Sequence, residues 1–414
     1  MILNGRRYTI TLVASDVSAD QNAGRLAGAL REMAPQVRLE GAGGELLREG
    51  GVKVVVDSRG ISMAGPPDSL QTVRALIRAW RDLTRLIKAN PPDVVVMVDN
   101  ENLNLLLARW LHKRGIRTVF FFPPQVWFWG RWRLRWIVPA ATRVLSAFKE
   151  EADLYRSAGA ETIWVGHPLR DVVRVTEDSW RAVAAIGLDP ARPLVVLMPG
   201  SREKELLANC PLMLQTARIL RQRDPLLQFA IPLAARSLQP LLEGAIRRAG
   251  ILDLVTYATQ SLAVLGRARA VLQCSGTATL ETGLLGIPSV IVYRCGPLQH
   301  FIARRAMHVK YIGMVNILLD ELVQPEFFHW QIDPLAIADE MWSLLTDQTR
   351  RERICARLAT LPKVMGPTGA IERAAKAVLE LLPGAGGNAR SDQRKPTPDA
   401  AEAIDNAGMA ASRG

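Results

Sequence analysis

The chain has 414 residues, too many for one compact core and suited to two domains of ordinary size. Its 49% hydrophobic and 22% charged fractions exclude a largely disordered protein, and no run approaches the roughly 18 apolar residues of a membrane-spanning helix. Lys and Arg outnumber Asp and Glu by 52 to 40, and this excess indicates a polyanion, a phosphate-bearing substrate or an acidic membrane surface as partner. The four cysteines and five histidines lack metal-ligand spacing, so we expect no metal and a reduced, cytoplasmic environment.

Short β-branched runs alternate with longer amphipathic segments along the chain. In the first half we expect strands at residues 8–14 and 93–98 and helices at residues 22–33 and 69–89. In the second half we expect strands at residues 194–198, 228–232, 254–257, 270–274 and 289–293. Strand, turn and helix in repetition predict an α/β protein with parallel sheets.

Turns and prolines interrupt the pattern around residues 166–193, between the two sets of strands. We therefore predict two Rossmann-like, doubly wound domains facing a cleft, one over residues 1–168 and one over residues 169–365. A final helix within residues 366–383 is expected to pack back on the N-terminal domain. Residues 384–414 are small, polar and aperiodic, so we expect a disordered tail.

Two glycine-containing turns follow predicted strands of the second half and could bind a phosphate. Gly200, Ser201 and Arg202 form the first, where the forked Arg side chain suits a diphosphate. Ser275, Gly276 and Thr277 form the second, with Glu281 one turn into the next helix. A plain turn with a surface Arg, and a capped helix with a solvated Glu, explain the two segments equally well. Neither matches a P-loop or dinucleotide fingerprint.

Asp99 follows the buried run DVVVMV, at the predicted end of a strand. There it could act as a general base that takes a proton from an attacking hydroxyl, or simply cap the next helix. His167 precedes a proline at the predicted domain crossover, which favours a structural role over substrate contact.

Residues 102–149 contain no Asp or Glu, yet they hold nine Lys or Arg and ten of the 24 aromatic residues. Interleaved Trp and Arg suit a membrane interface, where rings lie among headgroups and cations meet lipid phosphates. The residues predicted to bind the membrane are Trp127, Trp129, Arg131, Trp132, Arg133, Arg135 and Trp136. The alternative is a strand followed by a core loop with ordinary surface arginines. Nucleic acid ranks lower because no nucleic-acid-binding module accompanies the segment.

With these segments identified, the chain resembles the lipid-A-disaccharide synthases, which are two-domain glycosyltransferases of the B fold, over roughly residues 10–382. The motifs that carry the resemblance are PGSR at residues 199–202, SGTATLE at residues 275–281, the Tyr293–Arg294 pair, and the stretch up to Asn316 that precedes LVQPEFF. VGHPL, VWFW and DVVVMVD occur in the expected order in the first half.

The resemblance implies an inverting enzyme that joins UDP-2,3-diacylglucosamine to 2,3-diacylglucosamine 1-phosphate (lipid X), giving lipid A disaccharide 1-phosphate and UDP. It implies Asp99 as the base and no metal or other cofactor. The nucleotide sugar would contact Gly200, Ser201, Arg202, Ser275, Gly276, Thr277, Glu281, Arg294 and Asn316. Ser18, Asp20 and Gln125 would lie on the acceptor side. The acylated substrates would place the enzyme on the inner face of the inner membrane, and a homodimer stays open.

Three motifs in the first half depart from the family pattern. The glycine-rich G-E-A-S-G-D turn is SDVSAD at residues 15–20, D-x-P-D-F-N is DNENLN at residues 99–104, and S-P-S-V-W-A-W is PPQVWFW at residues 123–129. These departures leave open a divergent homologue with a different UDP-sugar or lipid acceptor. They are also compatible with a UDP-sugar epimerase and with a non-catalytic relative that binds a lipid or a nucleotide.

Overall fold

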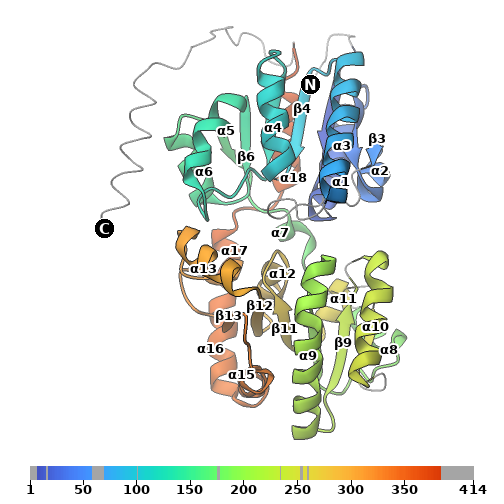
Figure 1. Cartoon of the computed structure of the whole chain (residues 1–414), viewed down its shortest axis with the longest axis vertical. Helices are drawn as coiled ribbons and strands as arrows, with labels where there is room; N and C mark the ends of the chain where they lie inside the picture. The colour runs from blue at the N-terminus through green and yellow to red at the C-terminus, as the bar shows by residue number, and fades with distance from the viewer. Residues whose placement is uncertain are drawn as a thin grey trace. The chain divides into compact units, whose positions relative to one another are not determined.

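The computed structural model describes residues 7–14, 17–57, 70–99, 101–174, 178–233, 235–251, 255–258 and 261–383. The predicted tail at residues 384–414 and the first two residues of the predicted turn at 15–20 lie outside these ranges. The chain divides into two compact units (Figure 1). Unit 1 comprises residues 1–168 and 365–414, and unit 2 comprises residues 169–364.

Unit 1 is built on a seven-stranded parallel sheet of order β3-β2-β1-β4-β5-β6-β7. Its strands are β1 (Thr9–Val13), β2 (Arg38–Gly43), β3 (Lys53–Asp57), β4 (Val94–Val98), β5 (Arg117–Phe121), β6 (Arg143–Ser146) and β7 (Thr162–Trp164). Its helices are α1 (Val17–Met33), α2 (Glu45–Glu49), α3 (Leu70–Ala89), α4 (Glu101–His112), the 3₁₀ helix η1 (Arg131–Arg133), α5 (Leu134–Ala140), α6 (Lys149–Ser157) and α18 (Ala370–Leu379).

The central strand β4 shows why this sequence forms a doubly wound sheet. All five of its residues, VVVMV, are fully buried, as a parallel strand covered on both faces requires. Val96 belongs to an apolar cluster that includes residues of α1 and α18, and Val95 belongs to a cluster with residues of α3 and α4 on the other face. Helix α1 begins at Val17, five residues before the predicted start, because Ala19 and Ala23 join this core despite the polar residues between them.

Unit 2 repeats the plan with a six-stranded parallel sheet of order β10-β9-β8-β11-β12-β13. Its strands are β8 (Leu194–Met198), β9 (Gln228–Pro232), β10 (Val255–Ala258), β11 (Ala268–Cys274), β12 (Ser289–Arg294) and β13 (Glu326–His329). Its helices are α7 (Leu169–Val172), α8 (Ser179–Ala185), α9 (Glu203–Arg223), η2 (Arg236–Leu238), α10 (Gln239–Ala249), α11 (Ser261–Leu265), α12 (Ala278–Leu284), α13 (Pro297–Ala306), α14 (Met314–Leu319), α15 (Pro334–Thr346), α16 (Gln348–Leu358) and α17 (Leu361–Val364).

The C-terminal helix α18 packs against α1 and therefore belongs to unit 1. Ala374, Ala375 and Val378 are buried at this contact, and the two small alanines allow the helices to approach closely. The Arg373 guanidinium, just before them, donates to the Val165 carbonyl oxygen (Nε to O 3.0 Å). The last helix thus contributes to the core of unit 1, which is otherwise formed by the N-terminal part of the chain.

We expect Ala375→Leu to lower the free energy of unfolding by about 1–3 kcal/mol, because the larger side chain overpacks the contact between α1 and α18. Lys376→Leu is the matched control, since the same side chain on the exposed face should change stability by no more than about 0.5 kcal/mol. Urea-induced unfolding followed by tryptophan fluorescence measures both. Equal effects of the two substitutions would argue against a tightly packed α18.

Candidate functional site

The strand order of each sheet reverses at one point, and the loops on either side of that point diverge to leave room for a ligand. In unit 1 the reversal lies between β1 and β4, and in unit 2 it lies between β8 and β11. We call the loops after β1, β4 and β5 the unit 1 site, and the loops after β8, β11 and β12 the unit 2 site. Most of the residues singled out in the sequence fall in these two places.

The unit 1 site is marked by strained backbone at the ends of two neighbouring strands. Asp99 and Phe122 have φ angles of 51° and 56°. Asp tolerates this left-handed region, whereas a bulky residue such as Phe rarely adopts it. The Asp99 N–H donates to the Phe121 carbonyl oxygen (3.0 Å), and the buried Asn104 side chain donates to the Asp99 carbonyl oxygen. Ser18 donates from Oγ to Asp99 Oδ2 at 3.5 Å, which brings the predicted base and one predicted acceptor-side residue together.

The other two predicted acceptor-side residues differ in their surroundings. Gln125 is half-buried in the loop that follows β5. Asp20 is buried, and its carboxylate accepts the N–H groups of Gly44 (2.6 Å) and Leu46 (3.0 Å) at the start of α2. Asp20 therefore caps helix α2, and its place on the acceptor side stays a prediction.

His167 is a buried structural histidine. Its ring contacts those of Phe122 and Phe148 at centroid distances of 5.4 and 5.3 Å. Burial, with a smaller contribution from the charge of Arg25, lowers the pKa of His167 to about 3. The ring is therefore neutral at physiological pH.

In the unit 2 site, the turn after β8 is organised by Glu205, a residue that the sequence analysis did not single out. Its Oε2 accepts the N–H groups of Ser201 (3.0 Å) and Arg202 (3.3 Å), and its Oε1 pairs with Arg202 Nη1 (2.8 Å). Gly200 has a φ of +128°, and a Cβ there would lie 2.4 Å from the Glu205 Cβ. The carboxylate thus occupies the anion position at the N-terminus of α9 and fixes Arg202 beside it.

Asn209, which the sequence analysis also did not single out, forms hydrogen bonds at the ends of three strands. It is buried, and its Nδ2 donates to the Pro199 carbonyl oxygen after β8 (3.2 Å) and to the Cys274 Sγ at the end of β11 (3.4 Å). Its Oδ1 accepts the N–H of Arg294 at the end of β12 (3.0 Å). One amide therefore fixes the spacing of the loops that make up the unit 2 site. A polar residue in the middle of an apolar helix face was the available signal.

The turn after β11 combines small residues with an open backbone. Gly276 has a φ of +154°, and an added Cβ there would meet no atom within 4 Å. Thr277 is exposed and makes no capping hydrogen bond, whereas Ser275 donates from Oγ to the Ile312 carbonyl oxygen (2.6 Å). Glu281 is half-buried in α12, and the side chain of Arg294 is exposed at the end of β12. The predicted nucleotide-side residues, except Asn316, thus lie in the turns after β8 and β11, in the first turn of α12 and at the end of β12.

Asn316 is fully buried, and its amide is used entirely by its own loop. Its Oδ1 accepts the N–H groups of Val323 (3.0 Å) and Gln324 (2.9 Å), and its Nδ2 donates to Glu326 Oε1 (2.7 Å). That Asn316 lines the nucleotide side stays a prediction. Its loop is linked to the turn after β11, because Glu326 also accepts the N–H of Ile312, the residue whose carbonyl oxygen accepts from Ser275.

The acid-free segment at residues 102–149 lies partly in the core of unit 1 and partly on its surface. Phe120 and Phe121 lie in the core as part of β5, as the strand interpretation requires. Trp127 is half-buried against Phe148, with ring centroids 5.8 Å apart. Arg133 is only 6% exposed and donates from Nη2 to the Trp129 carbonyl oxygen (3.0 Å). Trp127 and Arg133 are thus less exposed than Trp129 and Arg131, and their contact with a membrane stays a prediction.

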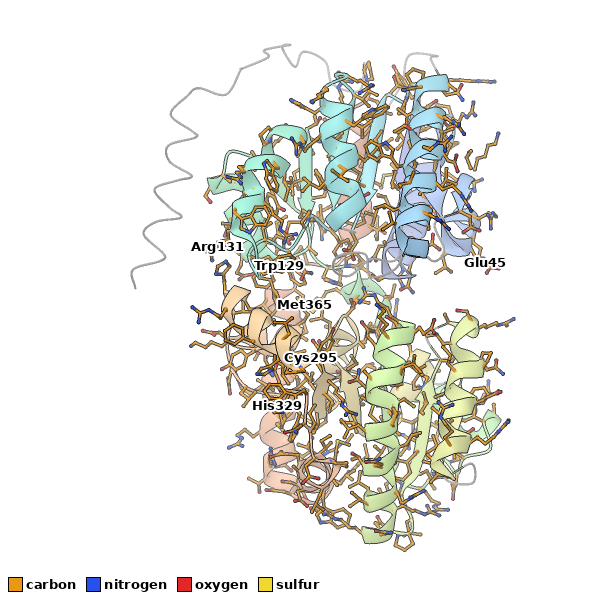
Figure 2. The ribbon with its side chains drawn as sticks, viewed as in Figure 1. Glu45, Trp129, Arg131, Cys295, His329 and Met365 are labelled. Carbon is orange, nitrogen blue, oxygen red and sulfur yellow. The ribbon has the colours of Figure 1, made fainter. Side chains whose placement is uncertain are left out.

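The other five residues of the predicted membrane set are exposed or half-buried. Trp129 and Trp132 are 39% and 52% exposed, Arg131 and Arg135 are exposed, and Trp136 packs edge-on against Trp132 at 4.9 Å. Figure 2 labels Trp129 and Arg131, which project from this part of unit 1. We call these five residues the Trp/Arg surface.

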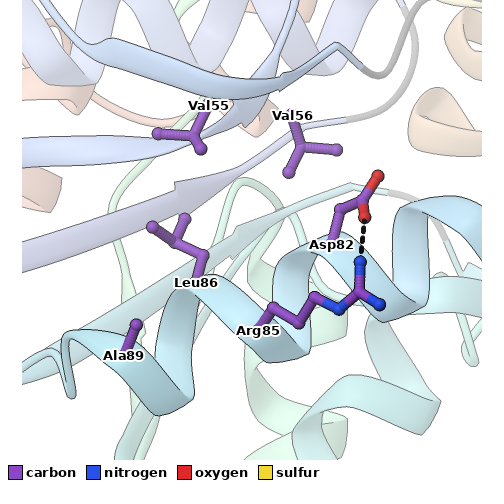
Figure 3. Close-up of a pocket in the computed structure, with 6 residues that line it drawn as sticks. All are labelled: Val55, Val56, Asp82, Arg85, Leu86 and Ala89. Atoms are coloured by element: carbon purple, nitrogen blue, oxygen red, sulfur yellow. Dashed lines mark ion pairs between the residues drawn. The ribbon is translucent and has the colours of Figure 1, made fainter.

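A pocket of about 360 Å³ lies between β3 and α3, away from both sites (Figure 3). It is lined by Val55, Val56, Asp82, Arg85, Leu86 and Ala89. Its polar groups are those of the Asp82–Arg85 ion pair (3.7 Å), so it offers little to recognise a polar ligand. Over the described ranges, His, Cys, Asp and Glu form no group of three that could hold a metal, and no helix has the length and apolarity to cross a bilayer.

Solved structures share the fold at low sequence identity. The UDP complex of MnaA from S. aureus has a TM-score of 0.63 at 13% identity and covers 94% of this chain and 100% of its own. The calicheamicin glycosyltransferase CalG4 has a TM-score of 0.57 at 16% identity and covers 91% of this chain and 98% of its own. These similarities confirm two Rossmann-like domains of the kind found in B-fold glycosyltransferases.

Relatives identified by sequence show which of the activities found on this fold the chain's family has. The family model described as lipid-A-disaccharide synthetase matches residues 10–368. The lipid-A-disaccharide synthase of Geobacter sulfurreducens is 35% identical over 91% of this chain and 97% of its own length. That of Coxiella burnetii is 31% identical over 90% of this chain and 98% of its own. The chain belongs to the lipid-A-disaccharide synthase family and is a glycosyltransferase of lipid A biosynthesis.

Proposed function

We propose that this enzyme transfers 2,3-diacylglucosamine from its UDP derivative to 2,3-diacylglucosamine 1-phosphate and releases UDP. The main support is that Asp99 and the two glycine turns, implied by the family resemblance, occur at the strand-order reversals of units 1 and 2. Such reversals are where doubly wound sheets bind ligands. The UDP in the complex of the structurally similar MnaA is consistent with a UDP-sugar donor.

In the proposed reaction, Asp99 takes the proton of the acceptor 6-hydroxyl. The hydroxyl oxygen then bonds to the anomeric carbon of the donor, and the bond from that carbon to the diphosphate oxygen breaks with inversion. A base must be held in place, and Asp99 is held at its N–H by Phe121, at its carbonyl by Asn104 and at its carboxylate by Ser18.

On the donor side, the developing negative charge of the diphosphate is the main electrostatic demand. Arg202 and the backbone around Gly276 and Thr277 would meet it without a metal. Glu205 already holds an anion's place beside Arg202, so we propose that the diphosphate competes with this carboxylate for Arg202. Arg294 and Glu281 would contact the nucleotide, since Arg294 ends β12 and Glu281 lies in the first turn of α12, beside the loops of the unit 2 site.

The acylated substrates of the proposed reaction reside in a membrane, so a membrane-binding surface would bring the enzyme to them. Exposed Trp rings beside exposed Arg side chains match the chemistry of a headgroup region. We propose that this surface binds unit 1 to the inner face of the inner membrane.

The reaction is tested by incubating the purified chain with UDP-2,3-diacylglucosamine and lipid X, and analysing the lipids by mass spectrometry. We expect a disaccharide 1-phosphate and an equal amount of UDP. A folded protein that makes no disaccharide from this pair, but releases UDP with another lipid acceptor, would show a different acceptor. Isomerised UDP-sugar without acceptor would indicate an epimerase.

Asp99→Asn should lower turnover by on the order of 10²–10⁴-fold, because an amide cannot take up the hydroxyl proton. Asn tolerates the positive φ of this position, so the backbone should be kept and UDP affinity should stay close to wild type. Asp93→Asn, at the other end of β4, is the control and should keep its turnover. An Asp99→Asn enzyme with near-normal turnover would exclude Asp99 as the base.

Arg131→Glu combined with Arg135→Glu should weaken binding to vesicles that contain phosphatidylglycerol by on the order of tenfold or more, at about 1 kcal/mol per charge near the lipid. The exposed pair Arg181→Glu and Arg353→Glu in unit 2 makes the same change in net charge and serves as the control. Vesicle co-sedimentation at low and high salt measures the effect. An equal loss of vesicle binding in both double variants would show that only the net charge of the protein matters, and not the Trp/Arg surface.

A further inference from the structure

A second acid-free segment lies in unit 2. Residues 282–319 contain no Asp or Glu, while they hold four Lys or Arg and two His. The segment includes β12, α13 and α14. In its excess of basic side chains it resembles residues 102–149 of unit 1, so its exposed surface is a second candidate for an anionic partner.

Within this segment, α13 has one anchored face and one exposed apolar face. His300 is buried, and its ring contacts those of Phe328 (4.8 Å) and Trp330 (5.2 Å). Leu298 and Phe301 are 71% and 60% exposed, which places them among the most exposed large apolar side chains of the described residues. Three-residue spacing places them on one face of the helix, on the side away from His300.

A cationic side chain borders this apolar face. The Arg305 guanidinium lies 5.7 Å from the Phe301 ring, one turn further along the same face, and is exposed. His308 and Lys310 follow the helix and are exposed too. With no carboxylate in the segment, an apolar patch with a cationic rim is left, and its charge is complementary to an anionic lipid surface.

The position of α13 in the chain connects this patch to the unit 2 site. Helix α13 begins at Pro297, three residues after Arg294, the proposed nucleotide contact at the end of β12. The short link means that whatever anchors α13 also restrains the loop that carries Arg294. Figure 2 labels Cys295, which lies in this link, and His329, whose ring is 5.3 Å from that of His300.

We propose that α13 is a second membrane-binding element, in which Leu298 and Phe301 enter the headgroup region of an anionic leaflet and Arg305 contacts lipid phosphate. The choice of a lipid surface as partner rests on the proposed function, since a diacylated donor must be collected from a membrane. Unit 2 would thus have its own lipid contact, in addition to the Trp/Arg surface of unit 1.

The test measures binding of the full chain to vesicles of phosphatidylcholine with and without phosphatidylglycerol. Leu298→Ser combined with Phe301→Ser should weaken binding to the anionic vesicles by at least about tenfold. The reason is that the variant has no apolar side chains at these two positions to transfer from water into the lipid. Arg305→Glu should weaken binding to anionic vesicles and leave the weaker binding to neutral vesicles unchanged. Each substitution is on the surface, so thermal unfolding should match that of the wild type.

The control pair Leu226→Ser and Leu335→Ser removes two similarly exposed apolar side chains elsewhere in unit 2 (60% and 49% exposed) and should bind like the wild type. Unchanged binding of the Leu298/Phe301 variant, or an equal loss in the control, would overturn the proposal. So would a variant that altered only the oligomeric state, since a second copy of the chain would then cover α13. Vesicle binding is measured without substrate. Absence of the disaccharide product would therefore reject the proposed reaction but would not change the outcome of the vesicle-binding test of α13.

Discussion

Parallel pairing within each sheet is the constraint on which both sites depend. Every strand of a parallel sheet ends at the same edge, and at the reversal of strand order the loops turn away from each other. Asp99 and Ser18 are 81 positions apart in sequence, yet they meet because β1 and β4 are neighbours in unit 1. The same relation brings the turns after β8 and β11 together in unit 2.

Polar side chains hold loops of both units in place. Asp20, Asn209 and Asn316 are buried, and each satisfies backbone N–H or C=O groups. The half-buried Glu205 accepts two N–H groups of an exposed turn. Asp and Asn suit both loop holding and ligand binding, because the same oxygen accepts from a helix N-terminus or from a sugar hydroxyl. Only the partner actually present distinguishes a loop-holding residue from one that faces the ligand.

Charge acts over longer segments than any motif in this protein. Two stretches without carboxylates, one in each unit, leave exposed rings beside exposed cations. An aromatic side chain is expensive to leave in water, and an unneutralised cationic surface attracts anions. A leaflet with acidic headgroups satisfies both requirements at once, which a free nucleotide sugar does not.

The α/β class, the two sets of strands and the positions of Asp99 and the two glycine turns followed from the sequence, because alternating apolar runs and glycine turns are local signals. The sequence also contained the basic, Trp-rich segment. Strand order, and hence which loops are neighbours, was decided only by the tertiary structure, since it depends on pairing between distant segments. The same holds for side-chain exposure: Arg131 and Arg133 are two residues apart in one run, and packing against Trp129 buries the second while leaving the first in solvent.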